Sequence, residues 1–249
     1  MFEKDLFEKA IMQIKKNYSE LGHNLGWSFL YTPKNSFSRN TKLLFLPLNP
    51  AGSKYYGPVH SEEKGNAFRV QEDWTGNGKS LQKQVQLMFG LISERLNNSL
   101  NFMELMDSTL TANICPFRST TWNELHNKIK TLEFVEQLWS EILIQIEPIV
   151  IINMAWSSHK ILKKVYKKNG YCLENQKNDK NMKVGWGTVT YSKDVFKKEG
   201  KEVTLIRLPH LSRYKIFGRE ESQEQVNEIV DIIVSKLKKD MMSGIDDCC

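Results

Sequence analysis

Hydrophobic residues recur at helical spacing near the start of the chain, where Leu6, Ala10, Ile11, Ile14 and Tyr18 fall on one side of a predicted helix. The stretch "SLQKQVQLMFGLISERL" is amphipathic in the same way, as expected of a helix that covers a core. Helices are therefore predicted from about residue 6 to 18 and at residues 80–96, 131–147, 157–170 and 222–241.

Apolar runs lie between these predicted helices. "KLLFLPL", "PIVIINM" and "EVTLIRLPH" are predicted as buried strands, and a short strand within "DSTLTANICPF" ends near Asn113. A continuous apolar run such as "PIVIINM" is typical of a central parallel strand, because both of its faces are buried. Strands and helices alternate almost throughout the chain. This order predicts an α/β fold, a three-layer α/β/α sandwich with a central four-stranded parallel sheet.

The 249 residues fit one large domain, since single α/β domains commonly reach about 200–250 residues. No internal repeat and no linker divides residues 1–249. Residues 171–201 are rich in lysine and asparagine and are predicted as a surface insertion, with a small hairpin at "KVGWGTVTY". The tail at residues 243–249 is predicted to be loose. The sequence indicates no role for the adjacent cysteines Cys248 and Cys249.

Charge and cysteine content narrow the functional classes. The net charge of +6 and the pI near 9.0 favour an anionic partner such as nucleic acid. The four cysteines include no CxxC spacing, which argues against a zinc or iron–sulfur site and against a disulfide framework. The N-terminus does not resemble a signal peptide, and no apolar run reaches the roughly 20 residues of a membrane span. We expect a soluble, cytoplasmic or nucleoid-associated protein without metal or membrane contact.

Three predicted strands end in loops that carry chemically active residues. They are "LNPAGSKYYGPVHSEEKGNAF", "NICPFRSTTW" and "LPHLSRYKIFG". In open α/β sheets the ligand crevice lies beyond the carboxyl ends of the strands. We therefore expect these loops to converge in space. The first loop raises a specific question, because a buried strand delivers an asparagine, Asn49, to its end and a rigid proline, Pro50, follows.

These loops, in this order, resemble the uracil-DNA glycosylase superfamily. "NPAG" at 49–52 is similar to the family's "NPG" or "DPY" loop, and "HLSR" at 210–213 is similar to its "HPS" loop. Ala51 and Leu211 depart from the glycine and proline of those motifs, which leaves the base specificity open. Supporting matches are "GNAF", "NICPFR", "IVIINMAWSSHKIL" and "HLSRYKIFGREESQEQVNEI", so that the resemblance covers about residues 43–233.

The resemblance implies two catalytic residues. Cleavage of a glycosidic bond places positive charge on the sugar and negative charge on the departing base. Asn49 would hold the attacking water below the sugar, because an amide is not basic enough to act as a strong base. His210 would donate a hydrogen bond to the oxyanion that develops on the base. The alternative is that Asn49 caps a turn before proline and that His210 is an ordinary polar residue after a strand.

The resemblance also implies a pocket for a flipped base. Asn113 would bind the hydrogen-bonding edge of that base, and Phe68 would stack on its ring. Pro50 and Tyr56, or its neighbour Tyr55, would complete the wall of the pocket. The alternative is that Asn113 satisfies the backbone at a strand end and that these aromatic residues belong to the core.

DNA contacts are expected on both sides of this pocket. Ser53, Lys54 and Ser212 would contact phosphates next to the flipped nucleotide. Arg213 and Tyr214 would fill the gap that the base leaves, which offsets part of the cost of flipping. The alternative is an ordinary solvated loop. The lysines of "HKILKKVYKK" and "SKLKKD" are expected on solvated helix faces.

The function implied by the resemblance is that of a monofunctional DNA glycosylase without metal or organic cofactor. A monomer would flip a base out of single- or double-stranded DNA, hydrolyse its bond to the sugar and leave an abasic site. Uracil is the default base, and a damaged or hypermodified base, including one of phage DNA, stays open, so the role is either repair or antiviral defence. The alternatives are a catalytically silent DNA- or protein-binding member and an enzyme of free nucleotides. The absence of a GxxxxGK[ST] loop argues against the last.

Overall fold

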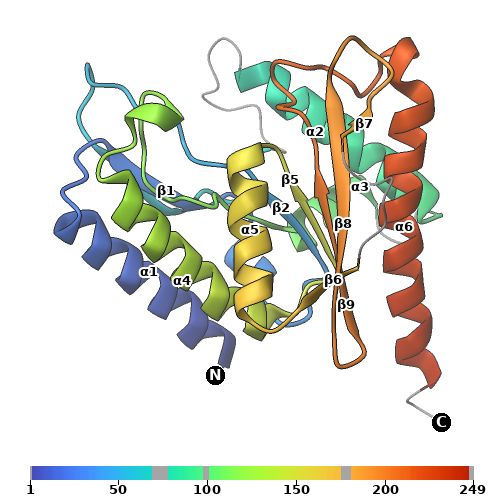
Figure 1. Cartoon of the computed structure of the whole chain (residues 1–249), viewed down its shortest axis with the longest axis horizontal. Helices are drawn as coiled ribbons and strands as arrows, with labels where there is room; N and C mark the ends of the chain where they lie inside the picture. The colour runs from blue at the N-terminus through green and yellow to red at the C-terminus, as the bar shows by residue number, and fades with distance from the viewer. Residues whose placement is uncertain (1, 69–77, 98–100, 175–180, 247–249) are drawn as a thin grey trace.

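The computed structural model of the chain describes residues 2–68, 78–97, 101–174 and 181–246, and Figure 1 shows how they are arranged. A seven-stranded sheet forms the centre of the molecule. Its strands follow the order β4-β2-β5-β9-β8-β6, with β7 paired to β8. No helix within the described ranges is long and apolar enough to cross a membrane. The strands are β2 (Leu43–Leu46), β4 (Leu110–Thr111), β5 (Val150–Asn153), β6 (Cys172–Glu174), β7 (Met182–Lys183), β8 (Thr190–Lys198) and β9 (Lys201–Arg207).

The sheet is mixed rather than wholly parallel, which corrects the expectation of a central four-stranded parallel sheet. The predicted strands β4, β2, β5 and β9 are parallel to their neighbours. Two further strands, β8 and β6, then continue the same sheet in antiparallel orientation. The α/β class is confirmed. One helix precedes β5 in the chain and another follows it, as expected because parallel strands need long connections.

Helices cover both faces of the sheet because successive residues of each central strand point to opposite sides. Leu44, Ile151 and Leu205 pack against α1, α4 and α5 on one face. On the other face Phe45 and Ile152 pack against α2, α3 and α6. Figure 1 shows the two helix layers on either side of the sheet. The helices are α1 (Phe2–Glu20), α2 (Gly78–Arg95), α3 (Phe102–Ser108), α4 (Lys128–Ile146), α5 (Trp156–Lys168) and α6 (Gln223–Asp246).

The region predicted as a surface insertion, residues 171–201, belongs largely to the sheet. Its longest strand, β8, pairs with β9 from Ser192 to Lys198 and buries Tyr191 and Phe196. The predicted hairpin is present, because Met182 and Lys183 of β7 pair with the start of β8. The polar composition was misleading because buried residues such as Tyr191, Val195 and Phe196 alternate with polar ones along β8. The C-terminal prediction was also partly wrong, since α6 continues to Asp246, while Cys248 and Cys249 lie outside the described residues.

A small sheet that the sequence pattern did not predict supports the loops at the carboxyl ends of the strands. Strand β1 (Gly26–Leu30) is wholly buried and runs parallel to β3 (Val59–Glu63). Gly26 has a φ of +90°, and a Cβ there would lie 2.1 Å from the carbonyl oxygen of Val59. Only glycine therefore permits this approach. The other side of β1 binds the second loop, because the amide of Ser28 donates to the carbonyl of Pro116.

Candidate functional site

The carboxyl ends of β2 and β9 carry the two predicted catalytic residues to one edge of the sheet. Asn49 lies three residues after β2, and His210 lies three residues after β9. The strand β5 lies between them and is parallel to both. Neighbouring strands are about 4.8 Å apart, so β2 and β9 are separated by roughly 10 Å. This order places the ends of β2 and β9 on opposite sides of β5.

Hydrogen bonds fix the orientation of the Asn49 amide. Its Nδ2 donates to the Ser119 Oγ over 2.8 Å and to the carbonyl oxygens of Pro50 and Phe117 over 3.3 and 3.5 Å. Carbonyl oxygens only accept, so the nitrogen must face them. Among the described residues no donor contacts Oδ1. This oxygen remains available to accept a hydrogen bond from a water or a ligand.

The second loop anchors the first in the same region. Ala51 forms a parallel bridge with Ser119, and the amide of Gly52 donates to the Ser119 carbonyl over 2.9 Å. The Arg118 guanidinium donates to the carbonyls of Ala51 and Val59 over 2.6 and 3.2 Å. Neither Ser119 nor Arg118 was singled out from the sequence. Their neighbours in "NICPFRSTTW" were the available signal, since that loop was predicted to meet the first.

The hydroxyl of Ser212 lies beside the His210 ring and influences which ring nitrogen carries the proton. The Ser212 Oγ lies 2.8 Å from Nδ1 of the His210 ring. A hydroxyl that donates to Nδ1 leaves the ring proton on Nε2, which is the arrangement that a hydrogen-bond donor to a ligand needs. The atoms around the ring lower the pKa of His210 from its ordinary 6.5, because desolvation disfavours the charged imidazolium. His210 is therefore neutral at pH 7. Ser212, predicted as a phosphate contact, lies where it can orient His210.

A cavity of about 290 Å³ opens beside His210. Its walls come from the ends of β5 and β9, the start of β8 and the loop after β9, so only the last of the three loops predicted to converge lines it. Asn49 does not line this cavity. The lining residues are Met154 to Trp156 after β5, Thr188 to Thr190 at the start of β8, Arg207 to His210 at the end of β9, and Tyr214.

Arg207 and Trp156 form the most distinctive pair in the cavity. The guanidinium carbon of Arg207 lies 3.8 Å from the centre of the Trp156 ring. Arg207 is 4% exposed, and burial lowers its pKa to about 10. It donates to the Ser192 Oγ and to the backbone and hydroxyl oxygens of Thr190. The sequence signal was a single arginine within the apolar strand "EVTLIRLPH", because buried cations are rare unless they are paired.

A buried polar network lies beneath this pair. His159 Nε2 is 2.7 Å from the Asp194 carboxylate, which also accepts from Lys163 over 2.9 Å. Burial opposes ionisation of Asp194, but the hydrogen bonds from His159 and Lys163 outweigh burial and lower its pKa. His159 Nδ1 lies 3.3 Å from the Asn153 amide. Since all but Lys163 are buried, this network joins α5 to β8 and is not open to a substrate.

The two residues predicted to recognise a base lie in the protein interior. Asn113 is 2% exposed, and its amide donates to the Ser28 carbonyl over 2.9 Å. Phe68 is also 2% exposed and packs on Tyr31 and Phe45 at ring distances of 6.0 and 5.7 Å. Neither lines the cavity beside His210. Both positions match the alternative interpretation of structural residues, and a base would reach them only after a rearrangement.

The other predicted contact residues surround the site. Pro50 is buried, whereas Lys54 and Tyr56 are exposed on the first loop, together with Tyr55. Ser53 accepts from the amide of Tyr55. In the last loop the exposed Arg213 places its guanidinium 5.4 Å from the ring centre of Tyr214, a residue of the cavity wall.

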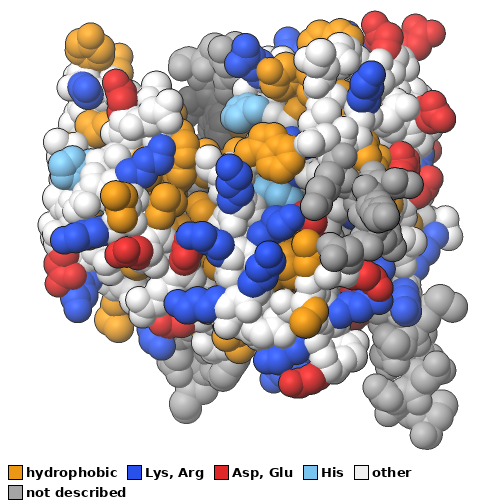
Figure 2. Space-filling view, in the orientation of Figure 1, with side chains coloured by type: hydrophobic (Ala, Val, Ile, Leu, Met, Phe, Trp, Pro, Cys, Tyr) orange, Lys and Arg blue, Asp and Glu red, His pale blue; other side chains and the backbone are white. Residues whose placement is uncertain are grey.

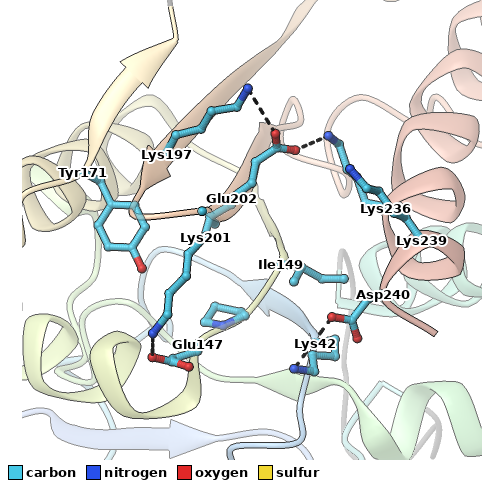
Figure 3. A pocket seen from close by; sticks show the side chains of 13 residues that line it. Lys42, Glu147, Ile149, Tyr171, Lys197, Lys201, Glu202, Lys236, Lys239 and Asp240 are labelled. Atoms are coloured by element: carbon cyan, nitrogen blue, oxygen red, sulfur yellow. Dashed lines mark hydrogen bonds and ion pairs between the residues drawn. The ribbon is translucent and has the colours of Figure 1, made fainter. Parts of the chain in front are cut away.

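A second, larger cavity of about 540 Å³ lies at the opposite end of the sheet, where β2, β5 and β9 begin. Figure 3 shows that its charged side chains point toward one another. Lys201 pairs with Glu147, and Lys236 pairs with Glu202. Two weaker pairs join Lys197 to Glu202 at 3.5 Å and Lys42 to Asp240 at 3.9 Å. Each of the three carboxylates thus pairs with a lysine, and the five lysines of the lining exceed them by two.

No protein-family model and no curated protein matches the chain.

Proposed function

We propose that the chain is a monofunctional DNA glycosylase with a uracil-DNA glycosylase-like fold. The observation that carries the proposal is the arrangement of Asn49 and His210 on either side of the end of β5. The Asn49 amide has a fixed orientation with its oxygen available, and His210 is a neutral imidazole with Nδ1 beside a hydroxyl. One group accepts from a water, and the other donates to a leaving base.

The proposed reaction is hydrolysis of the bond between deoxyribose and a base. Asn49 Oδ1 holds a water against C1′ of the sugar, and that water attacks as the bond to the base breaks. The electron pair of the bond passes to the base, where His210 Nε2–H stabilises the developing negative charge, and the proton that the attacking water gives up neutralises the departed base. A donor placed at such an oxyanion typically contributes a factor of roughly 100 to 1,000 in rate. The products are the free base and an abasic site, and no metal or cofactor takes part.

The proposed substrate is a deaminated, damaged or modified base in DNA, with uracil as the first candidate. The net charge of +6 favours association with a polyanion. A role in either repair or defence against phage with modified DNA agrees with this chemistry. We further propose that the protein acts as a cytoplasmic or nucleoid-associated monomer.

A catalytically silent DNA-binding protein is the second candidate. The burial of Asn113 and Phe68 favours it, because within the described residues neither side chain is open to a base. The position of Asn49 outside the cavity that His210 lines favours it as well. The free Asn49 oxygen argues for the enzyme, since a binding protein has no need of that geometry.

The deciding experiment is an abasic-site assay on labelled oligonucleotides that contain uracil, hypoxanthine, xanthine or hydroxymethylated pyrimidines, with phage DNA rich in modified bases as a further substrate. Wild type is compared with Asn49→Ala, His210→Ala and Asn40→Ala, the last a control at an exposed asparagine. Strand breaks after alkali that vanish in the first two variants and persist in the control support the enzyme. DNA binding without any abasic product supports the silent protein.

A further inference from the structure

Arg207 is a buried cation whose charge is not neutralised by a neighbour. Within the described parts of the chain no carboxylate pairs with it, and its three hydrogen bonds go to the neutral oxygens of Ser192 and Thr190. A guanidinium has five N–H donors, so two of them remain. Burial of a cation is costly unless an anion accompanies it. The cavity that Arg207 lines therefore suits an anionic group.

Trp156 makes the same position suitable for a flat ring. One face of its indole carries the Arg207 guanidinium at 3.8 Å, while 45% of the residue is exposed. A large aromatic side chain usually buries most of its surface. An indole that is held rigidly by an arginine and is still open to solvent can stack on a base at little entropic cost.

A second pair of the same kind lies across the cavity wall. The guanidinium of Arg219 lies 4.1 Å from the ring centre of Trp186, in the hairpin between β7 and β8. The Trp186 ring in turn lies 6.2 Å from that of Tyr214, which lines the cavity. The second pair thus adjoins the cavity through Tyr214, and Trp186 itself is not among the residues that line it.

The hairpin that carries Trp186 is fixed in place by close packing. Gly185 has a φ of +80°, and a Cβ there would lie 2.0 Å from the carbonyl oxygen of Glu221, in the 3₁₀ helix η3 (Glu220–Ser222). Backbone contact this close permits only glycine. The position of Trp186 is therefore a built feature of the fold.

Basic residues extend from this site along α5. Lys160 and Lys167 follow Trp156 at spacings of four and eleven residues, so the three share one face of the helix. Both lysines are exposed. Figure 2 shows basic side chains gathered over α5, with hydrophobic side chains beside them. A basic track beside aromatic rings, here the exposed Trp156 and the half-buried Trp186, is characteristic of surfaces that bind single strands.

We propose that this surface binds single-stranded DNA, with a phosphate at Arg207 and unpaired bases stacked on Trp156 and Trp186. Bases in a duplex are stacked on each other and cannot offer their faces to side chains, so the site discriminates against duplex DNA. The inference rests on the proposed function because it names single-stranded DNA as the substrate of the proposed glycosylase. The stacking interaction itself does not depend on catalysis.

Binding of fluorescently labelled 12-mers, measured by anisotropy at several salt concentrations, tests the proposal. The three probes are oligo-dT, an abasic-spacer strand with the same phosphates and no bases, and a 12-base-pair duplex. Wild type is expected to bind oligo-dT about tenfold more tightly than the spacer strand, because stacking adds to the phosphate contacts. Equal affinities for these two probes, or tighter binding of the duplex, would overturn the proposal.

Variants assign the effect to the two tryptophans. Trp156→Ala and Trp186→Ala are each expected to lower the affinity for oligo-dT about tenfold and to leave the spacer strand unaffected. Trp156→Phe should retain most of the affinity and shows that the site still folds. Ile144→Ala, at a residue 53% exposed on α4, is the control for loss of exposed apolar surface. Alanine variants that bind oligo-dT like wild type contradict the proposal.

The outcome also separates this inference from the proposed function. Base-dependent binding of single strands without any base release leaves the stacking site intact and removes the glycosylase. Base release from duplex DNA alone, together with unchanged binding by the tryptophan variants, removes the stacking site and leaves the glycosylase.

Discussion

The two ends of the central sheet differ in how their charges are satisfied. At the amino ends of the strands lysines and carboxylates meet in pairs such as Lys201 with Glu147 (Figure 3). At the carboxyl ends Arg207 is buried without a carboxylate partner in the described parts of the chain, and the Asn49 oxygen accepts no hydrogen bond there. The amino-end cavity is nevertheless the larger, at about 540 Å³ against about 290 Å³.

The site of the proposed function is the smaller of these two cavities, so volume alone would not have selected it. Exposed ion pairs contribute roughly 0–1 kcal/mol each to stability, and their charges are already paired without a ligand. The buried Arg207 guanidinium and the Asn49 oxygen can each form further hydrogen bonds, and a ligand or water can provide the partners. The smaller cavity, at the end where α/β folds usually bind ligands, is therefore the better candidate.

The largest expected difference between the two ends concerns base release. His210→Ala should lower the single-turnover rate roughly 100- to 1,000-fold, since it removes the donor to the leaving base. Lys201→Ala at the amino end also removes a cationic side chain and should leave the rate within about twofold, the change expected from one distant surface charge. Rapid-quench measurement on the responsive oligonucleotide checks both. Similar losses in the two variants would erase the distinction between the ends.

The second expected effect is a loss of stability in acid, and it comes from His23, a histidine that is buried in its neutral form. It is 6% exposed, its Nε2 lies 2.9 Å from the Thr131 hydroxyl, and burial and then the charge of His126 lower its pKa to about 4. Above pH 6.5 the His23 side chain is neutral in both the folded and the unfolded chain. As the pH falls from 6.5 to 4 the unfolded chain binds a proton that the folded chain does not, which removes about 3 kcal/mol of unfolding free energy.

Urea unfolding between pH 7 and pH 4.5 measures this loss. His23→Gln keeps a donor for Thr131 and should flatten the dependence on pH, whereas His60→Gln, at an exposed histidine, should leave it unchanged. A His23→Gln curve as steep as that of wild type would show that other groups cause the acid sensitivity.

A third, smaller effect concerns the groups that orient the catalytic side chains. Ser212→Ala removes the partner of His210 Nδ1 and should lower kcat about tenfold with little change in KM, because one hydrogen bond is worth about 1 kcal/mol. Ser212→Thr retains the hydroxyl and should restore the rate. In wild type the fall of kcat in acid should come at a lower pH than for an unperturbed histidine, because desolvation lowers the pKa of His210. A Ser212→Ala rate equal to that of wild type at every pH would remove the positioning role.

The smallest expected effect lies at the amino end. Glu147→Gln breaks the pairs with Lys201 and Arg39 and should change the unfolding free energy by at most about 1 kcal/mol, since the partners are exposed. Thermal unfolding and base release measured together check this prediction. A clear loss of base release in this variant would mean that the amino-end cavity takes part in function.

Much of the fold was predictable from hydrophobic patterns, and the misses have identifiable causes. The runs around Leu43–Leu46 and Val150–Asn153 are buried on both faces and could hardly be other than strands. Strand β8 was missed because Lys193 and Asp194 interrupt its pattern, and Asp194 is stabilised by His159 and Lys163, which are about thirty residues away in sequence. Such a tertiary pair leaves no local signal.

The candidate site was predictable in location and less so in composition. The strand-end rule placed Asn49 and His210 at one edge, where the structure has them. Arg207 and Trp156 were missed because their significance depends on stacking across 51 residues of chain. Asn113 and Phe68 were assigned to the base pocket from motif resemblance, which does not report how deeply a side chain is buried.

The measurement that tests the central claim most directly is mass spectrometry of the small molecules released from single-stranded DNA that carries the panel of altered bases. Wild type should release one free base and leave an equal amount of abasic site, and neither Asn49→Ala nor His210→Ala should do so at a comparable rate. Bound, unaltered DNA with no free base, or equal release by all three proteins, would contradict the assignment of this edge of the sheet as a glycosylase active site.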